Sequence, residues 1–211
     1  MYTVMIVDDS PFIVDIFVTM LERGGYQTVA AYGGEESLEV LQTIRPDIIL
    51  LDIMMEPMDG WETLIRIKSD ARLSDIPVMM LTAKQITPSE AQEYGIYIED
   101  YIMKPITHRE LYEAIEGLLN RRRLMDEDMN MAAAAGVPRA SIDEYIRLRK
   151  SVDINHRLLK LLESTYRIID ERQKPGDEID LAIGSMGMNI RFQEERLEEL
   201  RKEFTIGGGS G

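Results

Sequence analysis

Five polar side chains lie directly after short apolar runs in the first half of the chain, and together they could bind a divalent cation and a phosphoryl group. Asp8 and Asp9 follow the first of these runs. Asp52, Thr82 and Lys104 each follow a later one. Apolar runs of this length are typical of strands buried on both faces of a parallel sheet. Because ligands bind outside the carboxyl ends of such strands, we expect the five side chains to converge at one point.

Asp52 is the candidate nucleophile of this group. A carboxylate that attacks phosphorus forms an acyl phosphate, which is a high-energy ester. Mg²⁺ prefers oxygen ligands and keeps several waters, so Asp9 and Asp52 could bind it directly while Asp8 acts mainly through water. The cation would neutralise the carboxylates and the incoming phosphoryl oxygens. The sequence therefore predicts Mg²⁺ as the cofactor.

The other members of the group could hold the phosphoryl oxygens. The Lys104 ammonium would pair with one oxygen, and the Thr82 hydroxyl could donate a hydrogen bond to another. Ala83 is small, so its side chain leaves room for a phosphoryl group beside Thr82. These three residues are the predicted phosphate-binding residues.

The alternation of apolar runs with amphipathic stretches predicts an α/β domain over residues 1–120. Five β/α repeats in this length are typical of a five-stranded, doubly wound parallel sheet. The strands are expected near residues 2–7, 27–31, 47–52, 76–81 and 98–103. The helices are expected near residues 11–23, 35–44, 60–70, 87–94 and 107–120.

Residues 1–120 resemble the receiver domain of two-component response regulators, which has a flavodoxin-like fold. The resemblance rests on the spacing of the acidic pair Asp8-Asp9, Asp52, Thr82, Tyr101 and the Lys104-Pro105 pair. It implies that Asp52 is a phosphoacceptor and that a sensor histidine kinase is the donor. It also implies that Thr82 moves inward after phosphorylation and lets the Tyr101 ring become buried.

The resemblance further implies that the backbone carbonyl of Met54 is a metal ligand and that the peptide bond before Pro105 is cis. One position departs from the family, because Glu56 stands where a proline is usual and Pro57 follows it. Aspartate-nucleophile phosphatases share the Asp, Thr and Lys set, but they place an acidic proton donor two residues after the nucleophile. Met54 occupies that position here, so we expect a self-modifying phosphoacceptor and not an enzyme.

The composition restricts the classes of function. The net charge is −14 and nearly all of it lies in residues 1–120, which argues against nucleic-acid binding by that domain. The absence of cysteine excludes disulfides, zinc–thiolate sites and thiol nucleophiles. Neither a signal peptide nor a stretch long enough to span a bilayer is recognisable. The sequence therefore predicts a cytoplasmic protein with no membrane partner.

The second half of the chain has a helical pattern. We expect a linker over residues 121–137, an all-α helical hairpin over 138–206 with a break at 174–177, and a flexible glycine-rich tail over 207–211. Each helix shows a coiled-coil-like heptad seam. The first seam consists of Tyr145, Leu148, Val152, Asn155, Leu159, Leu162, Tyr166 and Ile169. The second consists of Ile179, Ile183, Met186, Ile190, Gln193, Leu197, Leu200 and Phe204.

Three functions are open for this half. The seams favour a hairpin that binds an unidentified downstream protein or a second copy of the chain, and a second copy would cover Leu158, Leu161 and Ile168 in a four-helix bundle. Residues 132–146 are similar to a helix-turn-helix, but Asp143 and Glu144 stand where DNA contacts usually lie, so DNA is disfavoured as a partner. His156 is a candidate phosphotransfer histidine, and a lone helical histidine is more often an ordinary surface residue.

Overall fold

The structure is a computed structural model that describes residues 1–169 and 177–207 and divides into two compact units. Unit 1 consists of residues 1–85 and 97–114, and unit 2 consists of residues 86–96 and 115 onward. Most of the expected break at 174–177 and most of the expected tail lie outside the described residues, and so do the side chains of Ile168, Ile169 and Phe204.

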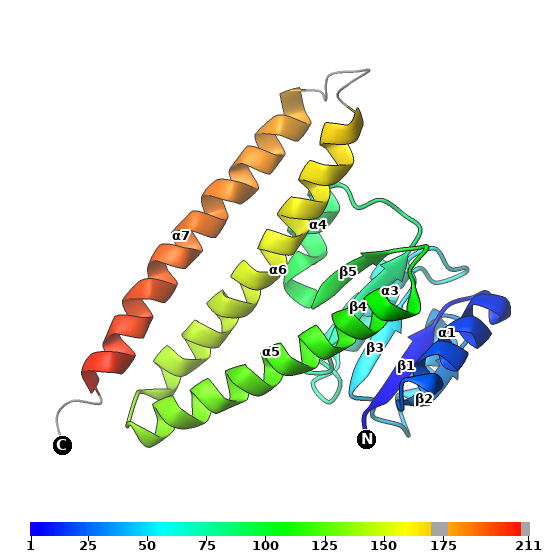
Figure 1. The fold of residues 1–211 in the computed structure, drawn as a ribbon, viewed down its shortest axis with the longest axis horizontal. Coiled ribbons are helices and arrows are strands. Elements are labelled where there is room, and N and C mark those ends of the chain that lie inside the picture. Colours follow the sequence, from blue (N-terminus) through cyan, green and yellow to red (C-terminus); the bar gives the residue numbers. More distant parts are fainter. Residues whose placement is uncertain (170–176, 208–211) are drawn as a thin grey trace. The chain divides into compact units, whose positions relative to one another are not determined.

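Unit 1 is built on a five-stranded parallel sheet, as the sequence predicts, and the order of its strands is β2-β1-β3-β4-β5 (Figure 1). Every residue of β3 and β4 and most of β1 is buried, which explains their uninterrupted apolar runs. The chain reverses its winding direction between β1 and β3, so a crevice is expected at the carboxyl ends of these two strands. The strands are β1 (Thr3–Val7), β2 (Gln27–Ala31), β3 (Ile48–Leu51), β4 (Val78–Thr82) and β5 (Asp100–Met103).

Three helices of unit 1 connect these strands: α1 (Pro11–Arg23), α2 (Gly34–Val40) and α3 (Gly60–Ser69). Proline at the first position of α1 suits a helix start, because the missing N–H has no intrahelical partner there. The Asp59 side chain caps α3 by accepting a hydrogen bond from the backbone N–H of Glu62 at 2.8 Å. These starts fix the direction in which the chain leaves the carboxyl ends of β1 and β3.

Unit 2 is all-helical. It contains α4 (Pro88–Tyr94), the later part of α5 (His108–Ala134), α6 (Arg139–Ile169) and α7 (Asp177–Gly207). The long helices α6 and α7 form the expected hairpin and lie side by side (Figure 1). None of the described helices is long and apolar enough to cross a membrane.

Helix α5 continues without interruption to Ala134, so most of the segment expected to be a linker is helical. No glycine or proline interrupts residues 118–135, and the ion pair between Arg123 and Glu127 at 2.7 Å supports the helix at i,i+4 spacing. The turn into α6 is made at Gly136, which has a φ of 76°.

The buried face of α6 is wider than its predicted seam: the seam residues Tyr145, Val152 and Leu162 are buried, and so are residues beside the seam. Leu158 and Ile154 are each 1% exposed, whereas the seam residue Leu159 is only half-buried. A Cβ atom added to Gly95, which directly follows α4, would lie 3.0 Å from Leu158 Cδ1. The expectation that Leu158 needs a second copy to cover it is therefore wrong, because the α4 segment of the same chain covers it. Leu161 is half-buried as well.

The face of α7 that packs on α6 agrees with the second seam. Ile190 and Leu200 are buried, and Ile183, Met186, Gln193 and Leu197 are half-buried. The two helices are also joined by polar contacts. Ser151 donates a hydrogen bond to Gln193 at 3.0 Å, and Arg196 donates two to Glu144 at 2.8 and 3.1 Å.

The ion pair between Glu144 and Arg196 should stabilise the hairpin less at acidic pH. Its hydrogen bonds hold the pKa of Glu144 below the ordinary range. A carboxyl group with a depressed folded-state pKa stabilises the fold above its unfolded pKa, and it loses this contribution as the pH falls through the folded value. We expect Glu144→Gln to lower the melting temperature slightly at pH 7, with the difference from wild type shrinking below about pH 4.3. A difference that stayed constant between pH 7 and pH 3 would contradict this role.

Candidate functional site

Asp8 and Asp52 leave the sheet side by side. Val7 and Leu51 are paired across β1 and β3, and each aspartate is the next residue in its strand direction. The backbone N–H of Asp52 continues the pairing by donating to the Val7 carbonyl at 2.9 Å. Both side chains are buried, at 4% and 6% exposure. Two carboxylates are thus held together where the crevice was expected.

Lys104 supplies the positive charge between them. Its Nζ atom lies 2.5 Å from Asp8 Oδ2 and 3.0 Å from Asp52 Oδ1. The backbone N–H of Lys104 donates to the Thr82 carbonyl at 2.8 Å, which ties the end of β5 to the end of β4. The peptide bond between Lys104 and Pro105 is cis, as the resemblance implies, and the bond before Pro57 is also cis.

The other carboxylate oxygens accept backbone hydrogen bonds. Asp52 Oδ2 accepts one from Met54 at 2.8 Å, and Asp8 Oδ1 accepts one from Ser10 at 2.9 Å. Asp9 is exposed, and its Oδ2 accepts one from Glu56 at 3.3 Å. Asp8 and Asp52 thus share the contact with Lys104, whereas the exposed Asp9 contacts the Glu56 backbone.

The chemistry of these donors fits Mg²⁺, since the three carboxylates and the Met54 carbonyl offer hard oxygen atoms. Within the described residues, no three acidic or histidine side chains are clustered tightly enough to hold a metal ion as they stand. Asp8 and Asp52 are instead neutralised by Lys104. Binding of a cation would therefore draw on the exposed Asp9 side chain in addition to Asp52.

The Thr82 side chain is buried at the end of β4, where its Oγ1 accepts a hydrogen bond from the Lys84 backbone at 3.2 Å. Ala83 beside it is exposed. Tyr101 is 8% exposed, and its hydroxyl donates to the Lys84 carbonyl at 2.6 Å. The ring is thus already in the inward position that was expected to follow phosphorylation.

Two further residues shape this site, Trp61 and Gly60, and sequence reasoning missed the contact that Trp61 makes. Trp61 stacks on the Tyr101 ring, with centroids 6.5 Å apart, and gives that ring an apolar surface to rest on. Gly60 is needed for space, because an added Cβ would lie 2.0 Å from the Asp52 carbonyl oxygen. The signal for both was their place directly after Asp59, at the start of the helix that follows the Asp52 loop.

The parallel sheet, the aspartates that follow β1 and β3, and the lysine that follows β5 agree with the receiver arrangement that the sequence resemblance implies. Residues 4–116 match the response regulator receiver domain. The chain therefore belongs to the receiver-domain response regulators of two-component systems. Residues 121–208 match a second family, which is described as Metanogen output domain 2.

Individual proteins are also similar to this chain. The DNA-binding dual master transcriptional regulator RpaA of Synechocystis sp. is 29% identical over 209 residues, which cover 92% of this chain and 86% of the relative. The N-terminal domain of a response regulator receiver protein from Methanoculleus marisnigri JR1 is 68% identical, with a TM-score of 0.49 and coverage of 56% of this chain and 97% of that one. The Vibrio cholerae chemotaxis protein CheY4 is 28% identical, with a TM-score of 0.53 and coverage of 56% and 98%.

Proposed function

We propose that Asp52 accepts a phosphoryl group from a sensor histidine kinase and that the helical unit 2 transmits the change through protein–protein contacts. The contact of one ammonium, Lys104 Nζ, with both Asp8 and Asp52 supports this role most directly. It places a cation beside the nucleophile before the reaction, where it can also pair with the phosphoryl oxygens that arrive.

In the proposed transfer, an Asp52 carboxylate oxygen forms a bond to phosphorus while the bond from phosphorus to the donor nitrogen breaks. The donor histidine leaves with the electron pair of that bond and takes a proton, and Asp52 becomes an acyl phosphate. Lys104 then pairs with a phosphoryl oxygen, and the Thr82 hydroxyl donates to another after releasing the Lys84 amide. The protein is the acceptor in this step and acts on no separate substrate.

Mg²⁺, when bound, would supply charge neutralisation for the carboxylates and the phosphoryl oxygens. Asp9, Asp52 and the Met54 carbonyl are the groups that would hold it, with Asp8 acting through water. Asp9 is suited to this task because it is exposed and its Oδ2 makes only a long contact, at 3.3 Å, with the Glu56 backbone.

Helix α4 provides a route from this site to the output. The chain passes from Thr82 through the Lys84 backbone, which both Thr82 and Tyr101 contact, into α4. Within unit 2, α4 packs against both α6 and α7. A phosphoryl group that recruits Thr82 would therefore alter the segment that leads into a helix of the output body.

We expect the Asp52→Asn variant to lose labelling by a small phosphodonor such as acetyl phosphate in the presence of Mg²⁺. The amide lacks the nucleophilic oxygen, so labelling should fall to background. The matched control is Asp59→Asn, because Asp59 caps α3 seven residues later and takes no part in the chemistry. Undiminished labelling of Asp52→Asn would refute the assignment of Asp52 as the phosphoacceptor. Labelling of an Asp9→Ala variant that depended on Mg²⁺ as in the wild type would refute the assignment of Asp9 as a metal ligand.

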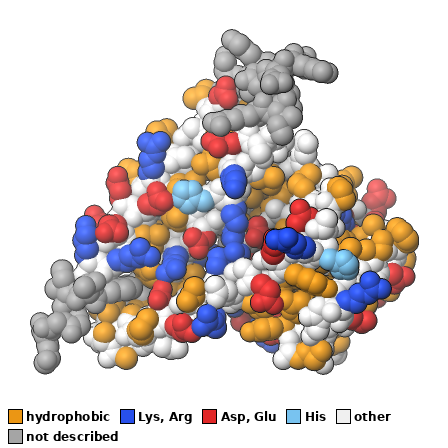
Figure 2. Space-filling model, in the orientation of Figure 1, with side chains coloured by type: hydrophobic (Ala, Val, Ile, Leu, Met, Phe, Trp, Pro, Cys, Tyr) orange, Lys and Arg blue, Asp and Glu red, His pale blue; other side chains and the backbone are white. Residues whose placement is uncertain are grey.

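DNA binding is a second candidate output, because the Synechocystis relative that matches along most of this chain is named a DNA-binding regulator. The described helix ends offer little support for it. Asp143 pairs with Arg139 at 3.0 Å, and Glu144 pairs with Arg196 of α7 at 2.8 Å, so two arginines near the start of α6 are already paired with carboxylates. Figure 2 shows acidic and basic side chains interspersed over the helices. An electrophoretic shift with duplex DNA at low salt would favour this output over the protein-binding one.

His156 remains a hypothesis as a phosphotransfer residue. The structure places it on the exposed side of α6, where its Nε2 lies 2.9 Å from Glu194 Oε1 on α7. The Glu194 carboxylate orients the imidazole of His156, and this contact fits a phosphotransfer histidine and an ordinary surface ion pair equally well. Labelling of the Asp52→Asn variant at histidine would be needed to support the relay role.

A further inference from the structure

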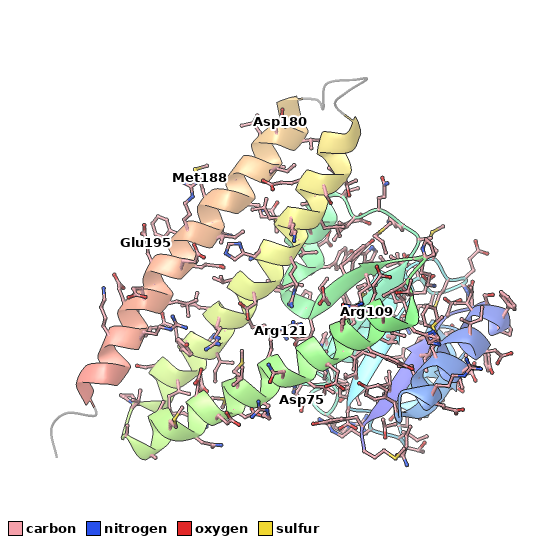
Figure 3. The ribbon with its side chains drawn as sticks, in the orientation of Figure 1. Asp75, Arg109, Arg121, Asp180, Met188 and Glu195 are labelled. Atoms are coloured by element: carbon pink, nitrogen blue, oxygen red, sulfur yellow. The ribbon has the colours of Figure 1, made fainter. Side chains whose placement is uncertain are left out.

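The outer face of α7 carries a stripe of exposed apolar side chains. Leu181, Met188 and Phe192 are 72%, 66% and 78% exposed. Their separations of seven and four residues align them along one side of the helix. Ile190, which is buried, lies on the opposite side. Figure 3 shows Met188 directed away from α6, so the stripe is not part of the core of the hairpin.

A groove adjoins this stripe on the side toward α6. It has a volume of about 360 Å³, and its lining includes Leu148 of α6 and Met188, Phe192 and Arg196 of α7. Most of the exposed surface inside it is apolar. The groove extends the stripe from a single line of side chains to a surface that an apolar side chain from outside could enter.

Charged residues flank the stripe on its other side, namely Asp180, Arg191, Glu195 and Glu198, and Asp180 and Arg191 are the pair of opposite sign level with the stripe. Asp180 and Arg191 are both exposed, and neither forms an ion pair within the described residues. They stand eleven residues apart, which is about 16 Å along a helix, so they cannot reach each other. In an antiparallel pair of identical helices, however, the same flank of each helix faces the other. The acidic end of one copy would then meet the basic end of the second.

We propose that the outer face of α7 binds the same face of a second copy of this chain in an antiparallel arrangement. With the two-fold axis near residues 186–187, Leu181 lies against Phe192 of the second copy. Asp180 then lies beside Arg191 of the second copy, and symmetry makes each contact twice. Leu181 of the second copy lies at the mouth of the groove between Leu148 and Phe192. One register thus accounts for the apolar stripe, the groove and both charges.

The size of the surface predicts a weak, concentration-dependent dimer. The stripe runs for about 16 Å, so the contact belongs to the small class of interfaces below about 1,200 Å². The proposal rests on a helical output that acts by protein contact, but it does not require phosphorylation of Asp52. The Asp52→Asn variant should therefore dimerise like the wild type when no phosphodonor is present, so each proposal can fail without the other.

Charge reversal in the full chain tests the register. Sedimentation equilibrium should show that Asp180→Arg and Arg191→Asp each weaken dimerisation about fivefold or more, because each turns two attractive pairs into repulsive ones. The double variant D180R/R191D should restore the wild-type affinity. Failure of the double variant to recover would overturn the antiparallel register. A wild-type chain that stays monomeric at several hundred micromolar would overturn the dimer and leave this face to a different protein.

A second measurement addresses the apolar stripe and the orientation. Phe192→Glu should abolish dimerisation, whereas Phe12→Glu, at an equally exposed phenylalanine of α1, should leave it unchanged. The chain has no cysteine, so introduced cysteines report contacts without background. A mixture of Leu181→Cys and Phe192→Cys chains should cross-link under oxidation more than either variant alone. Equal cross-linking of each variant with itself would indicate a parallel pair and overturn the proposal. Circular dichroism confirms that each variant is folded.

Discussion

Replacing Lys104 with Met is expected to destabilise the receiver unit by about 3 kcal/mol, because it leaves two buried carboxylates without their counter-charge. Lys104 Nζ contacts Asp8 at 2.5 Å and Asp52 at 3.0 Å, and both aspartates are less than 10% exposed. The change keeps most of the apolar stem of the side chain and removes the ammonium group, whose Nζ also lies 6.0 Å from the centroid of the Phe17 ring, so the lost charge and not lost packing should dominate. Urea unfolding of the full chain measures the effect, and Lys160→Met on the exposed side of α6 is the matched control.

The Lys104→Met variant also allows a test of whether the carboxylates of Asp8 and Asp52 repel each other. Adding Asp8→Asn to Lys104→Met removes one of the two carboxylates and should recover part of the lost stability, although Asp8→Asn alone should be destabilising. Mg²⁺ should also stabilise Lys104→Met more than wild type, since a cation can take over the missing charge. If the losses of unfolding free energy caused by Lys104→Met and by Asp8→Asn simply add in the double variant, the two carboxylates do not repel each other. Lys104 would then have another role.

The site was predictable because its members follow buried apolar runs. Asp8, Asp52 and Lys104 each come directly after a strand, and parallel strands bring their carboxyl ends to one edge of the sheet. The contact of Lys104 with both aspartates follows from this topology. The stacking of Trp61 on Tyr101 does not, because the two residues come from different elements whose distance no periodicity records.

The output unit was predictable as a hairpin but not in its packing. Alternating steps of three and four residues identify the apolar faces of α6 and α7, and they place Ile190 and Leu200 correctly. They cannot show that a third helix covers α6 on an adjacent face, because α4 is separated from Leu158 by more than sixty residues. The continuation of α5 to Ala134 was not predicted, because the charged residues that follow position 120 interrupt the apolar pattern of the helix.

The adjacent residues Leu158 and Leu159 separate the two descriptions of α6. If α6 packed only along its predicted seam with α7, Leu159 would contribute more to stability than Leu158. The structure instead buries Leu158 almost completely and Leu159 by half. We expect Leu158→Ala to cost about 2–5 kcal/mol of unfolding free energy, as other fully buried leucines do. Leu159→Ala should cost about 1 kcal/mol. Denaturant unfolding of the full chain, followed by the helical circular dichroism signal, compares these two substitutions of identical size.

The covering element can be identified in the same experiment. Gly95 approaches Leu158 at the end of α4, so the cavity left by Leu158→Ala should loosen α4 on α6. Amide hydrogen exchange of residues 88–94 should then rise in Leu158→Ala and stay at the wild-type rate in Leu159→Ala, because local opening follows the loss of packing contacts. Equal exchange in both variants would mean that α4 is held by other contacts. A rise confined to Leu158→Ala would link the helix that follows the Thr82 strand to the core of the output hairpin.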